Sequence, residues 1–156
     1  MTTSQDRGKL MRIGLILAAV IIIVRIMLEL AGAPEWINNI FGVAWLYLIF
    51  PVFFALSVAK SGVAGRFKAL LKDVFLFALY TRLMVMVSYM AAYQFQWPAP
   101  RFSSAMGGNV GAAVDALSGL LLIPGRNVLI WVVLATLVGI IVGGITLLAK
   151  RRAAAA

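Results

Sequence analysis

The chain has 156 residues, of which 63% are hydrophobic and 12% are charged, and its formal net charge is +9 at pH 7. Soluble domains average about 25% charged residues, so this composition excludes an ordinary soluble globular protein. The sequence contains neither cysteine nor histidine, which excludes disulfides, thiolate metal sites and bis-imidazole haem ligation.

Four apolar runs of about 20 residues are each long enough to cross a hydrocarbon layer about 30 Å thick. They predict four helical spans, at about residues 11–32, 41–60, 74–95 and 128–149. Segments that span lipid in this way are helical because a helix satisfies its own backbone hydrogen bonds. We therefore expect an all-α integral membrane protein, a four-transmembrane-helix bundle over residues 11–150 with short tails at 1–10 and 151–156.

Basic residues gather on one side of this four-span arrangement. Ten of them flank the spans there: Arg7, Lys9, Arg12, Lys60, Arg66, Lys68, Lys72, Lys150, Arg151 and Arg152. The other side has only Arg101 and Arg126. Because Lys and Arg accumulate in cytoplasmic segments, both tails are expected in the cytoplasm, and the charge bias favours a bacterial inner membrane. Orientation thus explains the positive charge, and no nucleic-acid partner is expected because no basic face carries interleaved aromatics.

The first apolar run also admits a second interpretation, as a secretory signal peptide. Residues 7–33 begin with basic side chains, continue through an apolar core and end in "AGA". Arg25 and Glu29 nevertheless stand where a cleavage region should be neutral, so a retained spanning helix is favoured.

Three ionisable residues lie inside the predicted spans: Arg25, Glu29 and Arg82. Each would cost about 2.5–3.5 kcal/mol at the centre of a span, so compensation is expected. Arg25 and Glu29 share a helix face, but Glu29 lies toward the C-terminal end of its helix, where the helix dipole disfavours an anion. Arg82 in the third span is the candidate second cation, since a long arginine side chain can cover the remaining gap. This predicts a buried Arg25–Glu29–Arg82 cluster, either a structural network or a site.

The connection "AKSGVAGRFKALLKDVF" between the second and third spans is basic and amphipathic. Phe67, Leu70 and Leu71 can enter the membrane interface while the basic side chains meet anionic headgroups. The simpler interpretation is a solvated, positively charged loop. In both cases the expected partner is a lipid bilayer with anionic headgroups.

The segment 96–127 is the only long connection in the four-span arrangement. Apolar residues at helical spacing predict a short interfacial or re-entrant helix within 105–124, ended by Pro124. Asp115 and Arg101 are the candidate polar site residues of this outer loop. Aromatic residues near the same surface, Trp131 among them, fit an interfacial belt.

Small residues mark the fourth span as a helix-packing element. Ala135, Gly139 and Gly143 recur every four residues, which lets helix backbones approach closely. Packing within the chain is favoured over a homodimer seam. Pro51 in the second span predicts a kink, and a packed kink is favoured over a gating one.

The chemistry available to the chain is limited. It has five acidic residues, and no paired carboxylates, nucleophile–base pair or metal motif are recognisable, so neither enzymatic activity nor a cofactor or metal is predicted. The favoured function is a non-catalytic subunit or scaffold of a membrane complex, with a membrane-protein partner or a second copy of the chain. The alternative is a small transporter, channel or lipid-handling protein that uses the charge cluster as an anion or proton-linked site.

Overall fold

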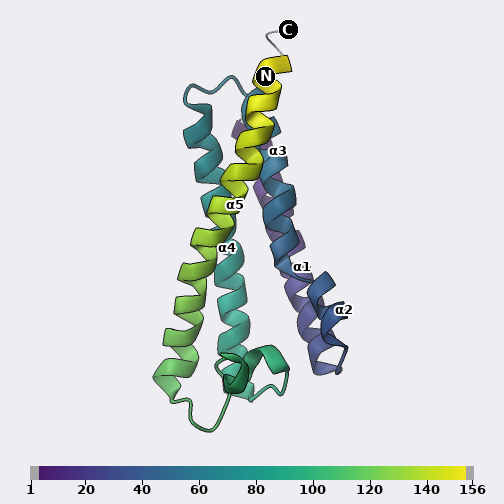
Figure 1. Ribbon diagram of the computed structural model, residues 1–156, viewed down its shortest axis with the longest axis vertical. Helices are drawn as coiled ribbons and strands as arrows, with labels where there is room; N and C mark the ends of the chain where they lie inside the picture. The colour runs from purple at the N-terminus through teal and green to yellow at the C-terminus, as the bar shows by residue number, and fades with distance from the viewer. Residues whose placement is uncertain (1–3, 154–156) are drawn as a thin grey trace.

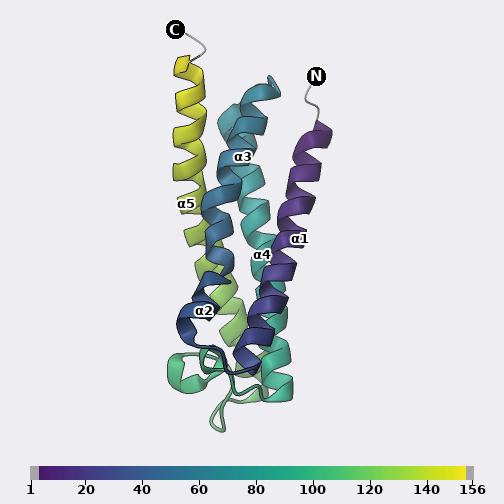
Figure 2. The same ribbon diagram turned by 90° about the vertical axis from the view of Figure 1, so that its right-hand side faces the viewer.

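The computed structural model describes residues 4–153 and is a bundle of four long helices. They are α1 (Ser4–Leu30), α3 (Leu46–Lys60), α4 (Arg66–Phe95) and α5 (Ile123–Ala153). The first residues of α1, the last of α5 and the turn after α3 lie at one end, here called the termini end (Figures 1 and 2). The remaining connections gather at the opposite, loop end. The described residues contain four helices long and apolar enough to cross a membrane, which confirms the prediction of an all-helical chain with four candidate spans.

Two helices, α1 and α4, extend further at the termini end than predicted. α1 begins at Ser4, within the expected tail, while residues 1–3 and 154–156 of the predicted tails lie outside the described residues. α4 begins at Arg66, so the amphipathic connection supplies its first turns. Leu70 is fully buried, and its prediction as an interfacial residue is wrong, because it packs against α5 at Gly143.

The second span is interrupted near its loop end. A short helix, α2 (Glu35–Ile40), is followed by a break and the 3₁₀ turn η1 (Val43–Trp45), which leads into α3. The break falls at Gly42, which is buried beside α1: a Cβ atom there would lie 3.5 Å from Nη1 of Arg25. This close approach brings η1 against the charged part of α1.

The fourth span starts earlier than predicted and absorbs part of the expected outer helix. A π-helical turn, η4 (Ser118–Leu122), runs directly into α5, and the apolar span extends over Ser118–Lys150. Pro124 therefore lies within the helix and does not end it. The wider turn before it accommodates the missing N–H of proline. The described residues show no separate helix within 105–124, which corrects that prediction.

The loop between α4 and α5 is nonetheless folded. It contains two 3₁₀ turns, η2 (Pro100–Phe102) and η3 (Ser104–Met106). Phe102 is fully buried, with its ring 5.0 Å from that of Tyr89 on α4. Asn109 is also fully buried and donates hydrogen bonds to the carbonyls of Tyr89, at 2.6 Å, and Gly119, at 2.8 Å. These contacts fasten the loop to both helices that it connects.

The small residues of α5 pack against helices of the same chain. A Cβ atom on Gly139 would lie 2.5 Å from Val74 Cγ1, and one on Gly143 would lie 3.0 Å from the carbonyl oxygen of Pro51. Ala135 is buried on the same helix. The predicted seam thus meets α3 and α4, and the proline of α3 is one of its packing partners.

We predict that Gly139→Ala lowers the melting temperature of the purified protein in detergent, because the added methyl overpacks the seam by about 1–3 kcal/mol. Gly144→Ala is the matched control, since its Cβ would meet no atom closer than 3.9 Å and gains only helix propensity. A melting temperature for Gly139→Ala equal to that of the control would contradict the close contact.

We predict that Asn109→Ala loosens the loop, because the carbonyls of Tyr89 and Gly119 lose the buried amide that donates to them, at a cost of about 2 kcal/mol. The measurement is amide hydrogen exchange of residues 98–117, which should accelerate. Asn39→Ala, at an exposed asparagine near the same end, should leave the exchange unchanged. Unaltered exchange in Asn109→Ala would show that the aromatic packing alone holds the loop.

Candidate functional site

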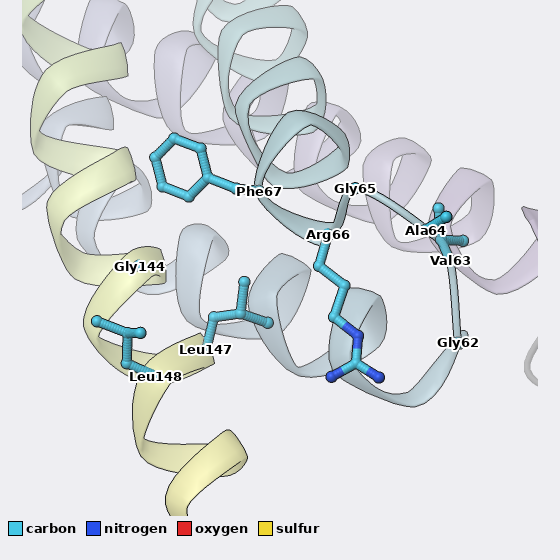
Figure 3. A pocket seen from close by; sticks show the side chains of 9 residues that line it. All are labelled: Gly62, Val63, Ala64, Gly65, Arg66, Phe67, Gly144, Leu147 and Leu148. Atoms are coloured by element: carbon cyan, nitrogen blue, oxygen red, sulfur yellow. The ribbon is translucent and has the colours of Figure 1, made fainter.

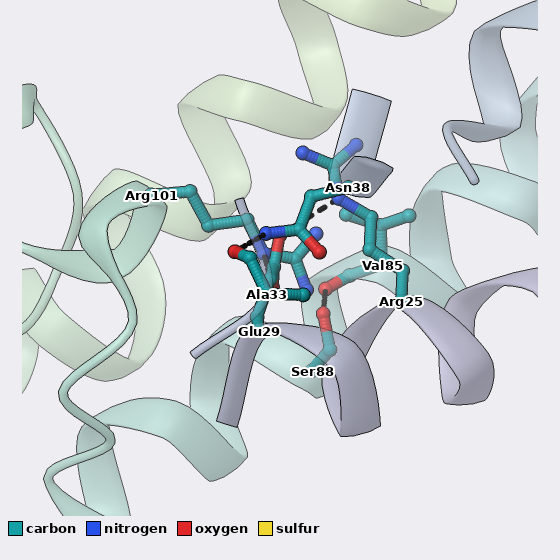
Figure 4. A network of polar contacts seen from close by, with 7 residues as sticks. All are labelled: Arg25, Glu29, Ala33, Asn38, Val85, Ser88 and Arg101. Atoms are coloured by element: carbon teal, nitrogen blue, oxygen red, sulfur yellow. Dashed lines mark hydrogen bonds and ion pairs between the residues drawn. The ribbon is translucent and has the colours of Figure 1, made fainter. Parts of the chain in front are cut away.

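A buried carboxylate joins two arginines at the loop end. Glu29 lies in the last turn of α1, and Arg25 Nε donates a 2.8 Å hydrogen bond to its Oε1 from one turn earlier. Arg101 Nε lies 2.7 Å from Oε2 of the same carboxylate. Figure 4 shows Arg101 reaching in from the loop, while Arg25 comes from α1 itself. The side chain of Glu29 is only 4% exposed, so both contacts are shielded from solvent.

The second cation on Glu29 is therefore Arg101 and not Arg82, and the structure differs here from the predicted cluster. Arg101 was predicted as a candidate site residue of the outer loop, with no contact to Glu29. It reaches Glu29 because η2 and the buried Phe102 hold the loop against α4. The guanidinium carbon of Arg101 lies 4.3 Å from the centroid of the Phe102 ring. Its position depends on a folded loop, which helix spacing alone does not reveal.

Arg82 occupies a different environment, about halfway along α4. It is 8% exposed, and its guanidinium carbon lies 4.5 Å from the ring centroid of Trp131 and 5.2 Å from that of Tyr47. No ion pair with Arg82 occurs in the described part of the chain, and its Nε atom is buried without a hydrogen-bond partner there. Cation–π contacts contribute about 0.5–2 kcal/mol, less than the desolvation of a buried charge costs.

The three arginines line one cavity of about 220 Å³, here called the arginine cavity. Its lining comprises Ile22, Arg25, Gly42, Val43, Ala44, Arg82, Val85, Tyr89, Arg101, Asn127 and Trp131. The volume corresponds to on the order of seven water molecules. Every long helix except α3 supplies side chains, and η1 closes the side toward α3.

A second cavity of about 430 Å³, here called the vestibule, adjoins the first at the loop end. Arg25, Tyr89 and Arg101 line both cavities, and Glu29 and Glu35 line only the vestibule. The side chains of Arg25, Glu29 and Arg101, here called the Glu29 network, therefore lie between the vestibule and the arginine cavity.

The charges around the arginine cavity do not balance. Three guanidinium groups face it, and among residues 4–153 the carboxylate that pairs with two of them is that of Glu29. Burial lowers the pKa of Arg101 below its usual range, and the nearby Glu29 opposes this shift. Arginine side chains carry a positive charge in proteins. The site carries an excess of two positive charges.

Several residues at or near the arginine cavity escaped the sequence analysis. Asn127 lines the cavity and Tyr47 contacts Arg82 from α3; both are uncharged, and no pattern distinguishes them from ordinary packing residues. Trp131 was expected in an interfacial belt, but a helix that starts at Ser118 places it about 20 Å from the loop end, at 1.5 Å per residue. That depth brings it level with Arg82.

Asp115 does not belong to the cavity. It is exposed and accepts hydrogen bonds from the backbone N–H of Ser118, at 2.9 Å, and from the Ser118 hydroxyl, at 2.7 Å. These hydrogen bonds lower the pKa of Asp115. The residue caps the beginning of the fourth spanning helix, as aspartate does at many helix N-termini.

A larger cavity of about 680 Å³ lies at the termini end. Figure 3 shows Arg66 and Phe67 from the start of α4 near Leu147 and Leu148 of α5. Arg66 is the only charged residue in its lining. Without converging polar groups this cavity is a weaker candidate than the arginine cavity.

Comparisons with known proteins give no relative: no family model, no curated protein and no solved structure matches the chain. Within residues 4–153, no group of three or more acidic side chains is placed to hold a metal ion. The functional argument therefore rests on the charges and shape of the arginine cavity.

We predict that Glu29→Gln destabilises the protein by about 3 kcal/mol, because it leaves Arg25 and Arg101 without their shared carboxylate. The control is Glu35→Gln, an exposed glutamate of the vestibule, with an expected change within about 0.5 kcal/mol. Thermal unfolding in detergent measures both. Arg101→Gln added to Glu29→Gln should cost less than the sum of the single changes. Strict additivity would show that the 2.7 Å contact contributes no coupling.

Proposed function

We propose that this chain is a multi-pass membrane protein that binds an anion in the arginine cavity, as a lipid-handling or transport protein. The observation that carries the proposal is Arg82, a nearly buried arginine with no carboxylate partner in the described structure. This corresponds to the second of the two functions considered from the sequence. The proposal is supported by the excess positive charge of the arginine cavity, which a bound anion would balance.

The proposed placement sets the four helices across a bilayer with the termini end in the cytoplasm. The ten flanking basic residues support this orientation, and compact size with this charge bias supports a bacterial inner membrane. Arg82 then lies about 20 Å from the loop end of α4, at 1.5 Å per residue, close to the bilayer centre. A charge at that depth costs about 2.5–3.5 kcal/mol on the insertion scale, and such residues typically mark ion or substrate paths.

Arginine suits the recognition of an anion in this setting. Its planar fork donates paired hydrogen bonds to phosphate or carboxylate oxygens, and these bonds are stronger where water is excluded. An anion bound between Arg25 and Arg82 would also give the unpartnered Nε of Arg82 an acceptor. The amide of Asn127 would add a neutral donor from α5.

Anionic headgroups at the termini end form a separate part of the proposal. Lys68 and Lys72 are exposed on the first turns of α4, where Phe67 is exposed as well. Such a pairing of basic and apolar side chains suits the interface of an anionic leaflet. The subunit or scaffold role stays a prediction, and the small-residue seam no longer supports it because that seam packs within the chain.

We predict that Arg82→Met weakens anion binding at least tenfold while the fold survives, since a buried charge replaced by a hydrophobe of similar size is often neutral or stabilising. Dodecyl phosphate and inorganic phosphate serve as probes, and the rise in melting temperature with ligand reports affinity. Arg12→Met, at an exposed arginine of α1, is the control. If neither probe stabilises the wild-type protein, or Arg82→Met responds like wild type, the proposal fails.

A further inference from the structure

The charge of the arginine cavity narrows the class of anion. Three guanidinium groups against one carboxylate leave an excess of two positive charges. A phosphomonoester carries about −1.5 to −2 at pH 7, whereas a phosphodiester carries a single charge. At about 220 Å³ the cavity is smaller than typical small-molecule pockets of about 300–1,000 Å³. It can hold a phosphate headgroup but not a whole amphiphile.

The route from the loop end is closed by the Glu29 network. The side chains of Arg25, Glu29 and Arg101 are 22%, 4% and 19% exposed, and two of them form the wall shared with the vestibule. The folded loop, with Phe102 fully buried, lies behind Arg101. A soluble anion from this side would have to separate Arg101 from Glu29 before reaching Arg82.

The opposite wall, between η1 and α5, is thin and apolar. Ala44 of η1 lines the cavity and is exposed. Trp131 of α5 is 40% exposed, yet its ring also contacts the guanidinium of Arg82. Leu48 and Leu134, one turn further along their helices, are exposed and continue an apolar surface. The indole of Trp131 thus lies both against Arg82 and at the surface of the bundle, whose surroundings are lipid under the proposed function.

We propose that the ligand is the phosphomonoester headgroup of a membrane amphiphile, which enters the arginine cavity sideways from the bilayer between η1 and α5. The inference rests on the proposed function and names its substrate class and route. The Trp131 ring moves aside, Arg25 and Arg82 bind the phosphate oxygens, and the acyl chain stays outside along Leu48 and Leu134. Glu29 keeps Arg101 in place and neutralises one of the three positive charges. A ligand with two negative charges then balances the cavity.

The test measures binding to the full chain in phosphatidylcholine nanodiscs by native mass spectrometry. Phosphatidic acid, a phosphomonoester, should bind at least tenfold more tightly than phosphatidylglycerol, a phosphodiester, and more tightly than inorganic phosphate. Arg82→Gln should abolish the preference, and Arg126→Gln, at an exposed arginine of α5 outside the cavity, should keep it. Equal binding of the two lipids, or of inorganic phosphate, overturns the inference but leaves anion binding intact. No binding of any probe overturns both.

The route is tested separately with single cysteines, because the natural chain contains none. Ala44→Cys lies on the proposed lateral side, and Ala33→Cys lines the vestibule. Each variant is labelled with a bulky maleimide before reconstitution. Labelling of Ala44→Cys should abolish the binding of phosphatidic acid, and labelling of Ala33→Cys should leave it unchanged. The reverse pattern would place the route through the vestibule and overturn the lateral one.

Discussion

The carboxylate of Glu29 is the point on which the loop end of the bundle depends. It contacts Arg25 within α1 and Arg101 across to the loop, so a single buried group ties a helix end to a segment far along the chain. The loop holds Arg101 in reach because Phe102 and Asn109 are buried against α4. Ion pair and loop fold therefore support each other, and neither is expected to persist without the other.

The helices are packed more closely in the middle of the bundle and toward the termini end than at the loop end. Near the middle and toward the termini end, Gly139 and Gly143 let α5 approach α3 and α4 until it touches Pro51. At the loop end the helices diverge, as Figure 1 shows, and the space between them contains the arginine cavity. Interiors packed to native density deform little, so the close contacts give the hollow end a rigid base. The proline is a packed part of that base.

The sequence was sufficient for the architecture because each span is a long apolar helix that must satisfy its own backbone. It also singled out Arg25, Glu29 and Arg82, since charge within an apolar run is conspicuous. The sequence could not show which side chains these charged residues contact. Arg101 reaches Glu29 only through a loop whose fold depends on tertiary contacts of Phe102. The π-helical turn before Pro124 was equally hidden, because proline in sequence normally signals the end of a helix.

The structure separates two roles that the sequence left joined in one cluster. A structural network has to match charges, and Glu29 with its two arginines comes close to doing so. Arg82 stands outside that network, and the side chains described against its guanidinium group are those of Trp131 and Tyr47. Replacing it by an apolar side chain would remove a desolvation cost of several kcal/mol, more than the rings return. Under the proposed function, an anion bound beside Arg82 would supply the compensation that this charge otherwise lacks.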